Sequence, residues 1–440
     1  MKQKYKDNVL KTLIYLSIPT ILEQLLSTLL QYVDTAMVGH LGEQATASVS
    51  ITTTISWLVG SISSAFGVAV LAIISRSIGE NDINKIKEMS KLTARIVFVV
   101  GFVLTIISIS LSPFIPAWMQ AEEGVRKQAG IYFFIISIPL VFRAASTIYG
   151  AAIRAAQDTK TPMIINMLAN ILNVILNYIF IYAFDLGVTG AAIGSALSYV
   201  LAGTLMYMKF KHKNIFNYKR ERINISKELI SETIKLTTPV LGTSIVSCLG
   251  YTFFAGMVSG MGTVIFDAHS IAVTAETIFY IPGYGIRTAT SAMIGLAYGE
   301  GDSEKYNKIK RLSILITVGM MFVTGLTLFF VSYPLMTLFT NSSRVATLGA
   351  DMLKLVAFSE PFFGLMVVSE GIYYGLGKTK YPFVVESVCM WGIRLLFTFL
   401  GIKFFDFGLR EVWFCMIADN VTKAIMLFIP LLKKNLHSKC

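Results

Sequence analysis

Long apolar runs constrain this chain more than any other feature of its sequence. The 440 residues are 54% hydrophobic and only 15% charged, whereas an average soluble domain has about 25% charged residues. The runs are long enough to cross a bilayer as helices, which takes about 20 residues each, and they are not the alternating segments of about 10 residues that build an outer-membrane barrel. We therefore predict an all-α polytopic membrane protein. The twelve predicted transmembrane helices cover residues 12–38, 46–75, 93–115, 129–153, 162–183, 188–208, 234–260, 268–297, 311–337, 349–374, 382–405 and 409–432.

Positively charged residues are concentrated in alternate loops. Arg76, Lys85 and Lys87 lie in the loop after the second predicted span, and the segment from about Lys209 to Lys227 is the most basic part of the chain. The positive-inside rule places such loops in the cytoplasm, so we predict that both termini are cytoplasmic. Membrane topology thus accounts for the net charge of +12, and we expect no nucleic acid partner. The first segment has no small-residue cleavage site, and together with the twelve predicted spans this favours a multi-pass protein of the cell inner (plasma) membrane.

The chain repeats itself at a constant offset of 220 residues. The matching positions are Pro19 with Pro239, Gly42 with Gly262, Asp82 with Asp302, and Thr159-Lys160-x-Pro162 with Thr379-Lys380-x-Pro382. Six spans per repeat give both halves the same orientation and predict two pseudo-symmetric six-helix bundles with a site at their interface. We accordingly predict an N-lobe over residues 1–212 that contains an ion-coupling site, a basic cytoplasmic linker over 213–230, and a C-lobe over 231–440.

A carboxylate near the outer end of the first predicted span is the strongest functional signal. Asp34 costs roughly 2.5–3.5 kcal/mol to insert at the centre of a membrane helix, so such a residue usually faces a protein cavity. Glu23, Ser27 and Gln31 fall on the same helix face, within an arc of about 100°. This polar stripe is predicted to face either a cavity or a neighbouring helix, and the sequence leaves both interpretations open.

Four asparagines lie on one face of the fifth predicted span. Asn166, Asn170, Asn173 and Asn177 are separated by 4, 3 and 4 residues, which places their side chains within an arc of about 60°. Together with Ser195 on the sixth span, such neutral groups can serve Asp34 in its ionised or its protonated form. A purely structural network between helices is the alternative, since each such bond contributes about 0.6–2 kcal/mol.

The second half has different chemistry at the matching positions. Phe254 stands 220 residues after Asp34, and the seventh predicted span contains no carboxylate between Thr237 and Gly262. Carboxyl groups and tyrosines occur instead in the eighth and tenth spans. The residues predicted to line a substrate cavity are Gln31, Asn170, Glu276, Tyr280 and Glu370.

Motifs of ATP-driven or hydrolytic proteins are missing from the sequence. There is no Walker A, no HExxH and no GxSxG, so we predict neither an enzyme nor a bound cofactor. An ion gradient is the remaining source of energy. One charge that moves through about 100 mV yields about 2.3 kcal/mol.

Short motifs follow a fixed order along nearly the full length of the chain. They include Val33-Asp34-Thr35-x-x-Val38-Gly39, Ile153-Arg154-Ala155-x-x-Asp158-Thr159-Lys160-x-Pro162, Asn173-x-x-x-Asn177, Pro282-Gly283-x-Gly285-Ile286 and Trp391-Gly392-Ile393-Arg394. In this ordered set the chain resembles the multidrug and toxic compound extrusion (MATE) family. The resemblance implies a V-shaped pair of six-helix bundles that exports organic cations by alternating access, in exchange for entering H⁺ or Na⁺.

The resemblance also implies roles for individual residues. Asp34 matches the protonation or sodium site, Asn173, Asn177 and Ser195 match its polar partners, and Pro19 matches the proline at which the helix bends. Many relatives have an acidic residue at the position of Asn177, and some use a carboxylate in the seventh span. This chain has neither, which leaves Asp34 as the leading coupling residue, and as a metal ligand only if sodium is the coupling ion. We expect small organic cations as substrates, and a monomer in the bilayer.

Two other functions are possible for a membrane protein of this kind. A flippase for a lipid-linked sugar or another amphiphile, from the same superfamily, typically has a cavity rich in arginine and lysine for pyrophosphate, whereas here these residues cluster in predicted cytoplasmic loops. An intramembrane enzyme would need convergent histidine, serine or paired carboxylates. The four histidines, at positions 40, 212, 269 and 437, lie at span ends, in loops or in the tail.

Overall fold

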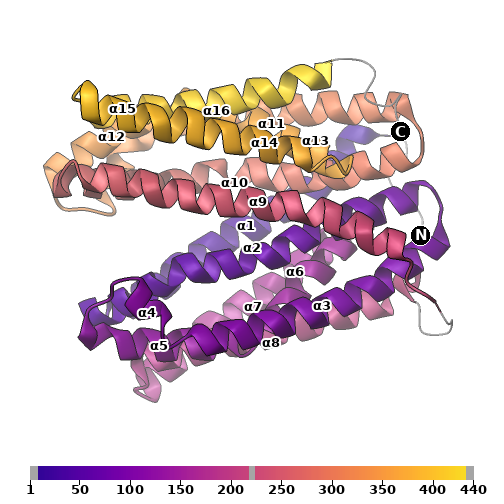
Figure 1. The fold of residues 1–440 in the computed structure, drawn as a ribbon, viewed down its shortest axis with the longest axis horizontal. Helices are drawn as coiled ribbons and strands as arrows, with labels where there is room; N and C mark the ends of the chain where they lie inside the picture. Colours follow the sequence, from indigo (N-terminus) through magenta and orange to yellow (C-terminus); the bar gives the residue numbers. More distant parts are fainter. Residues whose placement is uncertain (1–7, 218–222, 433–440) are drawn as a thin grey trace. The chain divides into compact units, whose positions relative to one another are not determined.

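The computed structural model describes residues 8–217 and 223–432 of the chain (Figure 1). The basic residues predicted to be cytoplasmic at positions 2, 4, 6, 433 and 434, and part of the basic linker, lie outside the described residues. All regular elements within them are helical. The helices are α1 (Val9–Gly39), α2 (Glu43–Gly79), α3 (Ile83–Leu111), α4 (Ile115–Trp118), α5 (Glu123–Ser137), α6 (Leu140–Ala155), α7 (Lys160–Tyr178), η1 (Ile179–Ala183), α8 (Gly187–His212), η2 (Asn214–Phe216), α9 (Lys227–Ser259), α10 (Thr263–Gly299), α11 (Ser303–Thr337), α12 (Ser343–Ala357), α13 (Glu360–Gly375), α14 (Lys380–Cys389), η3 (Met390–Leu395), α15 (Leu396–Phe404) and α16 (Leu409–Leu432).

By length and composition, the described helices include up to twelve membrane spans. Ten are continuous, and two more arise if each bent helix pair is one span. The predicted all-α fold with twelve transmembrane helices is confirmed.

Two of the predicted spans, 129–153 and 349–374, are broken helices, which the sequence analysis did not predict. The axes of α5 and α6 differ by 50°, and those of α12 and α13 by 57°. A proline stands at each break, Pro139 just before α6 and Pro361 in the first turn of α13. Proline cannot donate a backbone hydrogen bond and disfavours helical geometry in the residue before it, so the helix changes direction there.

The internal repeat has the same local structure in both copies. Gly42 and Gly262 precede α2 and α10 with φ angles of 107° and 119°, a conformation that only glycine adopts without strain. The carboxylates of Asp82 and Asp302 accept hydrogen bonds from the backbone N–H groups of the third residues that follow, at 2.9 and 2.8 Å, and so cap α3 and α11.

Asp158, in the turn between α6 and α7, is held by three donors. It accepts hydrogen bonds from the backbone and hydroxyl groups of Thr161 at 3.0 and 2.8 Å, and an ion pair of 2.7 Å joins it to Lys213. Burial raises the pKa of the Asp158 carboxyl, but the hydrogen bonds from Lys213 and Thr161 outweigh this effect and keep the pKa below its usual value. This contact ties the end of α8 to the start of α7.

The chain packs into two compact units whose boundaries fall inside helices. One unit is Leu22–Thr238; the other contains the chain up to Ile21 and from Pro239 onward. Within the second unit, the Thr20 hydroxyl donates to the carbonyl of Gly285 at 2.8 Å. Within the first, Lys85 of α3 pairs with Glu232 of α9 at 3.2 Å. Both α1 and α9 therefore contribute residues to two units, and each changes unit close to its proline, Pro19 or Pro239.

Candidate functional site

Three helices of the unit Leu22–Thr238 bring the predicted coupling residues together. Asp34 lies on α1, Asn173 and Asn177 lie one turn apart on α7, and Ser195 lies on α8. Figure 1 shows α7 and α8 side by side. Gly194 permits this approach, because a Cβ atom there would lie 2.1 Å from Oδ1 of Asn177.

The carboxylate of Asp34 is held by amides. Asn177 donates from Nδ2 to Oδ1 of Asp34 at 2.9 Å. With its amide nitrogen toward Asp34, Asn173 donates to Oδ1 at 3.0 Å and to Oδ2 at 2.6 Å, while its own oxygen accepts from the hydroxyl and the backbone N–H of Ser195 at 3.1 and 3.2 Å. The four side chains predicted from the sequence thus form one connected cluster.

Asp34 has no basic partner among the described residues. Its carboxyl group is half-buried, whereas the two asparagines beneath it are 8% and 1% exposed. Neutral amide and hydroxyl groups can hydrogen-bond both a carboxylate and a protonated carboxyl. A fixed lysine or arginine would instead keep the carboxyl permanently ionised. The cluster is therefore suited to a reversibly bound cation.

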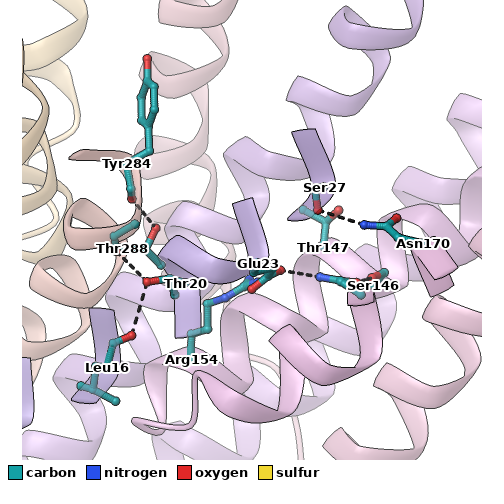
Figure 2. Close-up of polar contacts among 12 residues, drawn as sticks. Leu16, Thr20, Glu23, Ser27, Ser146, Thr147, Arg154, Asn170, Tyr284 and Thr288 are labelled. Carbon is teal, nitrogen blue, oxygen red and sulfur yellow. Dashed lines mark hydrogen bonds and ion pairs between the residues drawn. The ribbon is translucent and has the colours of Figure 1, made fainter. Parts of the chain in front are cut away.

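A second polar cluster, which was not predicted, lies nearer the N-terminus of α1 (Figure 2). Glu23 forms an ion pair of 2.6 Å with Arg154 of α6 and accepts a hydrogen bond of 2.5 Å from Asn166 of α7. Ser27 accepts a hydrogen bond from Asn170 at 3.0 Å. The asparagine face of α7 therefore serves two clusters. The sequence signals for this cluster were the polar stripe on α1 and the motif that contains Arg154. Neither signal predicts that Glu23 contacts Arg154.

The predicted cavity residues have different surroundings. Gln31 is exposed, and the side chain of Asn170 contacts Ser27 rather than Asp34. Glu370 of α13 forms an ion pair of 3.0 Å with Arg287 of α10, whose guanidinium also lies 4.7 Å from the ring centre of Tyr284. Their role as substrate contacts stays a prediction.

Four charges form a buried network in the unit from Pro239 onward. Lys423 of α16 contacts Glu386 at 2.8 Å and Asp419 at 3.0 Å, and Arg394 of η3 contacts Asp419 at 2.8 Å. None of the four residues is more than 7% exposed, and two acidic groups balance two basic ones. The network connects α14 and η3, which correspond to α7 of the first repeat, with α16, which corresponds to α8.

Phe254, the counterpart of Asp34, lies beside this network. Its ring centre is 5.7 Å from the guanidinium carbon of Arg394, and Ser247 on the same helix donates to Glu386 at 2.6 Å. The spacing of Asp419 and Lys423, four residues apart on α16, was the only sequence signal for these contacts. The second repeat thus holds fixed ion pairs where the first holds a carboxylate among amides.

Comparison with known proteins gives consistent matches over the whole chain. The MatE family model matches residues 19–179 and again residues 239–400, which is the repeat seen in the sequence. "Probable multidrug resistance protein NorM" of Thermotoga maritima is 25% identical over 94% of this chain and 90% of its own length. The human "Multidrug and toxin extrusion protein 1" is 22% identical over 98% of this chain and 76% of its own.

Solved structures match the fold closely. The Vibrio cholerae MATE transporter VcmN has a TM-score of 0.92 with 21% identity and covers 99% of this chain and 100% of its own. An outward-facing multidrug resistance MATE transporter has a TM-score of 0.93 with 19% identity, over 99% and 98%. At these identities the structural matches establish the fold.

Proposed function

Because the chain belongs to the MatE family, we propose that it is a multidrug efflux transporter that exports organic cations in exchange for an entering coupling ion. The membrane helices and the internal repeat described above support such a function. The proposed orientation has both termini in the cytoplasm, as the distribution of basic residues predicts.

The Asp34 cluster is the observation that carries this proposal. The side-chain amide of Asn173 can both donate and accept hydrogen bonds. With its nitrogen toward Asp34 it donates to a carboxylate, and with its oxygen there it accepts from a protonated carboxyl. The separation of 2.6 Å between the Asn173 amide and Oδ2 of Asp34 lies within the usual range of an O–H···O hydrogen bond and slightly below that of an N–H···O bond to a charged group. A rotation of one amide therefore serves both protonation states, and we propose H⁺ as the coupling ion.

Coupling requires that the ion and the drug favour different conformations. A ligand shifts an equilibrium only by its difference in affinity for the two states. Protonation of Asp34 changes its hydrogen bonds to Asn173 and Asn177 of α7. It therefore changes how strongly α1 is held against α7. Pro19, which lacks a backbone donor, is the proposed point at which α1 bends. Reciprocity then requires that drug binding weaken proton binding by the same factor.

The flippase alternative is disfavoured by a specific observation. A pyrophosphate group would need basic side chains that are free to face a cavity. Within the described membrane helices, four of the basic groups that are buried or partly buried are already paired with acids, whereas Arg143 of α6 donates to the carbonyl of Ser56 at 3.3 Å and lies over the ring of Tyr199. Arg154 pairs with Glu23, Arg287 with Glu370, and Arg394 and Lys423 with Asp419 and Glu386.

Ethidium transport in proteoliposomes tests the proposal. A pH gradient and a sodium gradient are imposed separately, and movement of ethidium against its own gradient is followed by fluorescence. We expect the pH gradient to drive uphill movement and the sodium gradient to have no effect. Sodium-driven movement would replace H⁺ by Na⁺ at Asp34. No uphill movement with either gradient, in folded protein, would overturn the drug-antiport function.

Replacement of Gly194 by alanine is expected to impair this transport. The added Cβ would lie 2.1 Å from Oδ1 and 3.1 Å from the backbone nitrogen of Asn177, so the amide must leave Asp34. Loss of a hydrogen bond to a charged group costs about 1.5–3 kcal/mol, which predicts at least a tenfold lower export rate. Gly319→Ala is the matched control, because a Cβ there meets no atom within 4 Å. Equal rates for the two variants would contradict the prediction.

A further inference from the structure

The buried and partly buried acids on the membrane helices of the unit from Pro239 onward fall into two groups. Glu370, Glu386 and Asp419 each contact a lysine or an arginine within 3.0 Å. Glu276 of α10 and Glu360 of α13 do not, as neither forms an ion pair among the described residues. In the other unit the same division separates Glu23, paired with Arg154, from Asp34. Each unit therefore has acids without a fixed cation on its membrane helices, Asp34 in one unit and Glu276 with Glu360 in the other.

Helices α10 and α13 run parallel and in register. A Cβ atom at Gly371 would lie 2.7 Å from the carbonyl oxygen of Arg287, and one at Gly375 would lie 2.5 Å from that of Ser291. Contact positions thus advance by four residues on both helices, which is the sign of a parallel pair. Glycine at these positions lets the two backbones touch.

The same register brings Glu276 and Glu360 to one level. The rings of Tyr280 and Phe363 are 5.1 Å apart, and the two glutamates stand about one helical turn before these aromatic residues on their respective helices. Glu276 stands 11 residues before Arg287 and Glu360 stands 11 residues before Gly371, so the register of the two backbones places the glutamates opposite each other. The pair therefore forms one site built from two helices.

Glu360 occupies an unusual place in the fold. It is the first residue of α13, directly after the 57° break of the span, and it is only 1% exposed. Its Oε2 atom has no hydrogen-bond partner among the described residues. The counterpart 220 residues earlier is Leu140, which also begins the helix after a break. The second repeat has thus placed an acid at a helix N-terminus inside the membrane, where the helix dipole favours negative charge.

Two neighbouring carboxyl groups in a medium of low dielectric constant cannot both be ionised without a counter-ion. A proton needs a single oxygen, whereas a metal ion needs a shell of several. Within the described residues, no third acidic, histidine or cysteine side chain joins the two glutamates in a group that could hold a metal. We propose that Glu276 and Glu360 share one exchangeable proton and form a second proton-binding site, in the unit that lacks Asp34.

The basic group near the pair is already bound to other residues, so it does not take the place of the shared proton. Arg394 is the basic group whose charge acts on Glu276, but it is bound to Asp419 at 2.8 Å and to Asn420 at 3.1 Å. On α10, Tyr280 directs its hydroxyl to Thr277 at 3.2 Å. On α11, which packs against Glu360, Gly325 presents no charge. The role of this site in transport rests on the proposed proton coupling, whereas its ability to bind a proton does not.

Infrared difference spectroscopy of the full chain in a lipid bilayer tests the site directly. Sodium-free buffers of acidic and alkaline pH are exchanged over the sample, and the carbonyl bands of protonated buried carboxyl groups are titrated. In Asp34→Asn we expect one titrating band to remain. In the double variant Glu276→Gln and Glu360→Gln we expect that band to vanish while the band of Asp34 remains. Either single variant is expected to shift the midpoint of the remaining group at least tenfold in proton concentration.

Glu370→Gln is the matched control, since this buried acid of α13 already has Arg287 as its partner and its loss should leave the titrating band unchanged. The proposal is overturned if Asp34→Asn shows no titrating buried carboxyl, or if the double variant retains the wild-type bands. Displacement of the band by sodium at constant pH would also overturn it, in favour of a metal cation. Because the spectra do not depend on transport, they test the second proton site even if ethidium is not exported.

Discussion

Replacement of Asp34 by asparagine is expected to reduce uphill export of ethidium to the level of protein-free liposomes. An asparagine cannot change its charge, so the imposed pH gradient loses its point of coupling. It can still accept the hydrogen bond from Asn177 and exchange one with Asn173, which join Asp34 at 2.9 Å and at 2.6–3.0 Å. We therefore expect the free energy of unfolding to change by no more than about 1 kcal/mol.

The measurement is ethidium fluorescence in proteoliposomes, with the amount of inserted protein and its thermal unfolding midpoint determined in parallel. Asp267→Asn is the control, as this acid also lies near the end of a membrane helix but is exposed. Asp267→Asn should export at the wild-type rate. An Asp34→Asn protein that still concentrates ethidium would show that the coupling residue lies elsewhere.

Replacement of Lys423 by methionine is expected to have the largest effect on stability. The ammonium group contacts both Glu386 and Asp419, so its loss leaves two buried carboxylates with Arg394 alone. Removal of one partner from a buried ion pair costs about 3–5 kcal/mol. The double variant Lys423→Met and Glu386→Gln restores the balance of charge and should recover most of this loss.

Thermal unfolding in detergent measures the effect. Lys354→Met serves as the control, because Lys354 pairs with Asp351 at 3.5 Å with 44% and 58% of the two side chains exposed, and an exposed pair contributes about 0–1 kcal/mol. If Lys423→Met unfolds at the wild-type temperature, or if Glu386→Gln fails to restore it, the four charges do not act as a balanced network.

The Asp34 cluster shows how much of the site can be predicted from local sequence pattern. Asn173 and Asn177 are four residues apart, so helical periodicity places them on one face without knowledge of the fold. That this face meets Asp34 could be inferred only because a buried carboxylate requires polar neighbours. The hydrogen bond that joins Asn177 to Asp34 spans 143 residues of chain, and its geometry was supplied by the packing of α7 against α1.

Glu276 and Glu360 show what local sequence pattern cannot predict. Glu276, Glu360 and Glu370 look alike in the sequence, each an acid in an apolar span. Only the register of α10 against α13 assigns Arg287 to Glu370 and leaves the other two together. The break before α13 was equally invisible in the hydropathy of 349–374, because a bent span and a straight one have the same composition.

By itself the sequence determined which segments enter the membrane, that the chain is a duplicated helical protein, and which polar residues share a helix face. These properties follow from hydrophobicity, from periodicity and from a constant offset, all of which act along the chain. Only the tertiary structure decided which buried charges are neutralised, as in Arg154 with Glu23 across 131 residues, and which have no fixed counter-ion. Electrostatic interaction depends on distance in space, and the distance between two helices is set by the packing of every side chain between them.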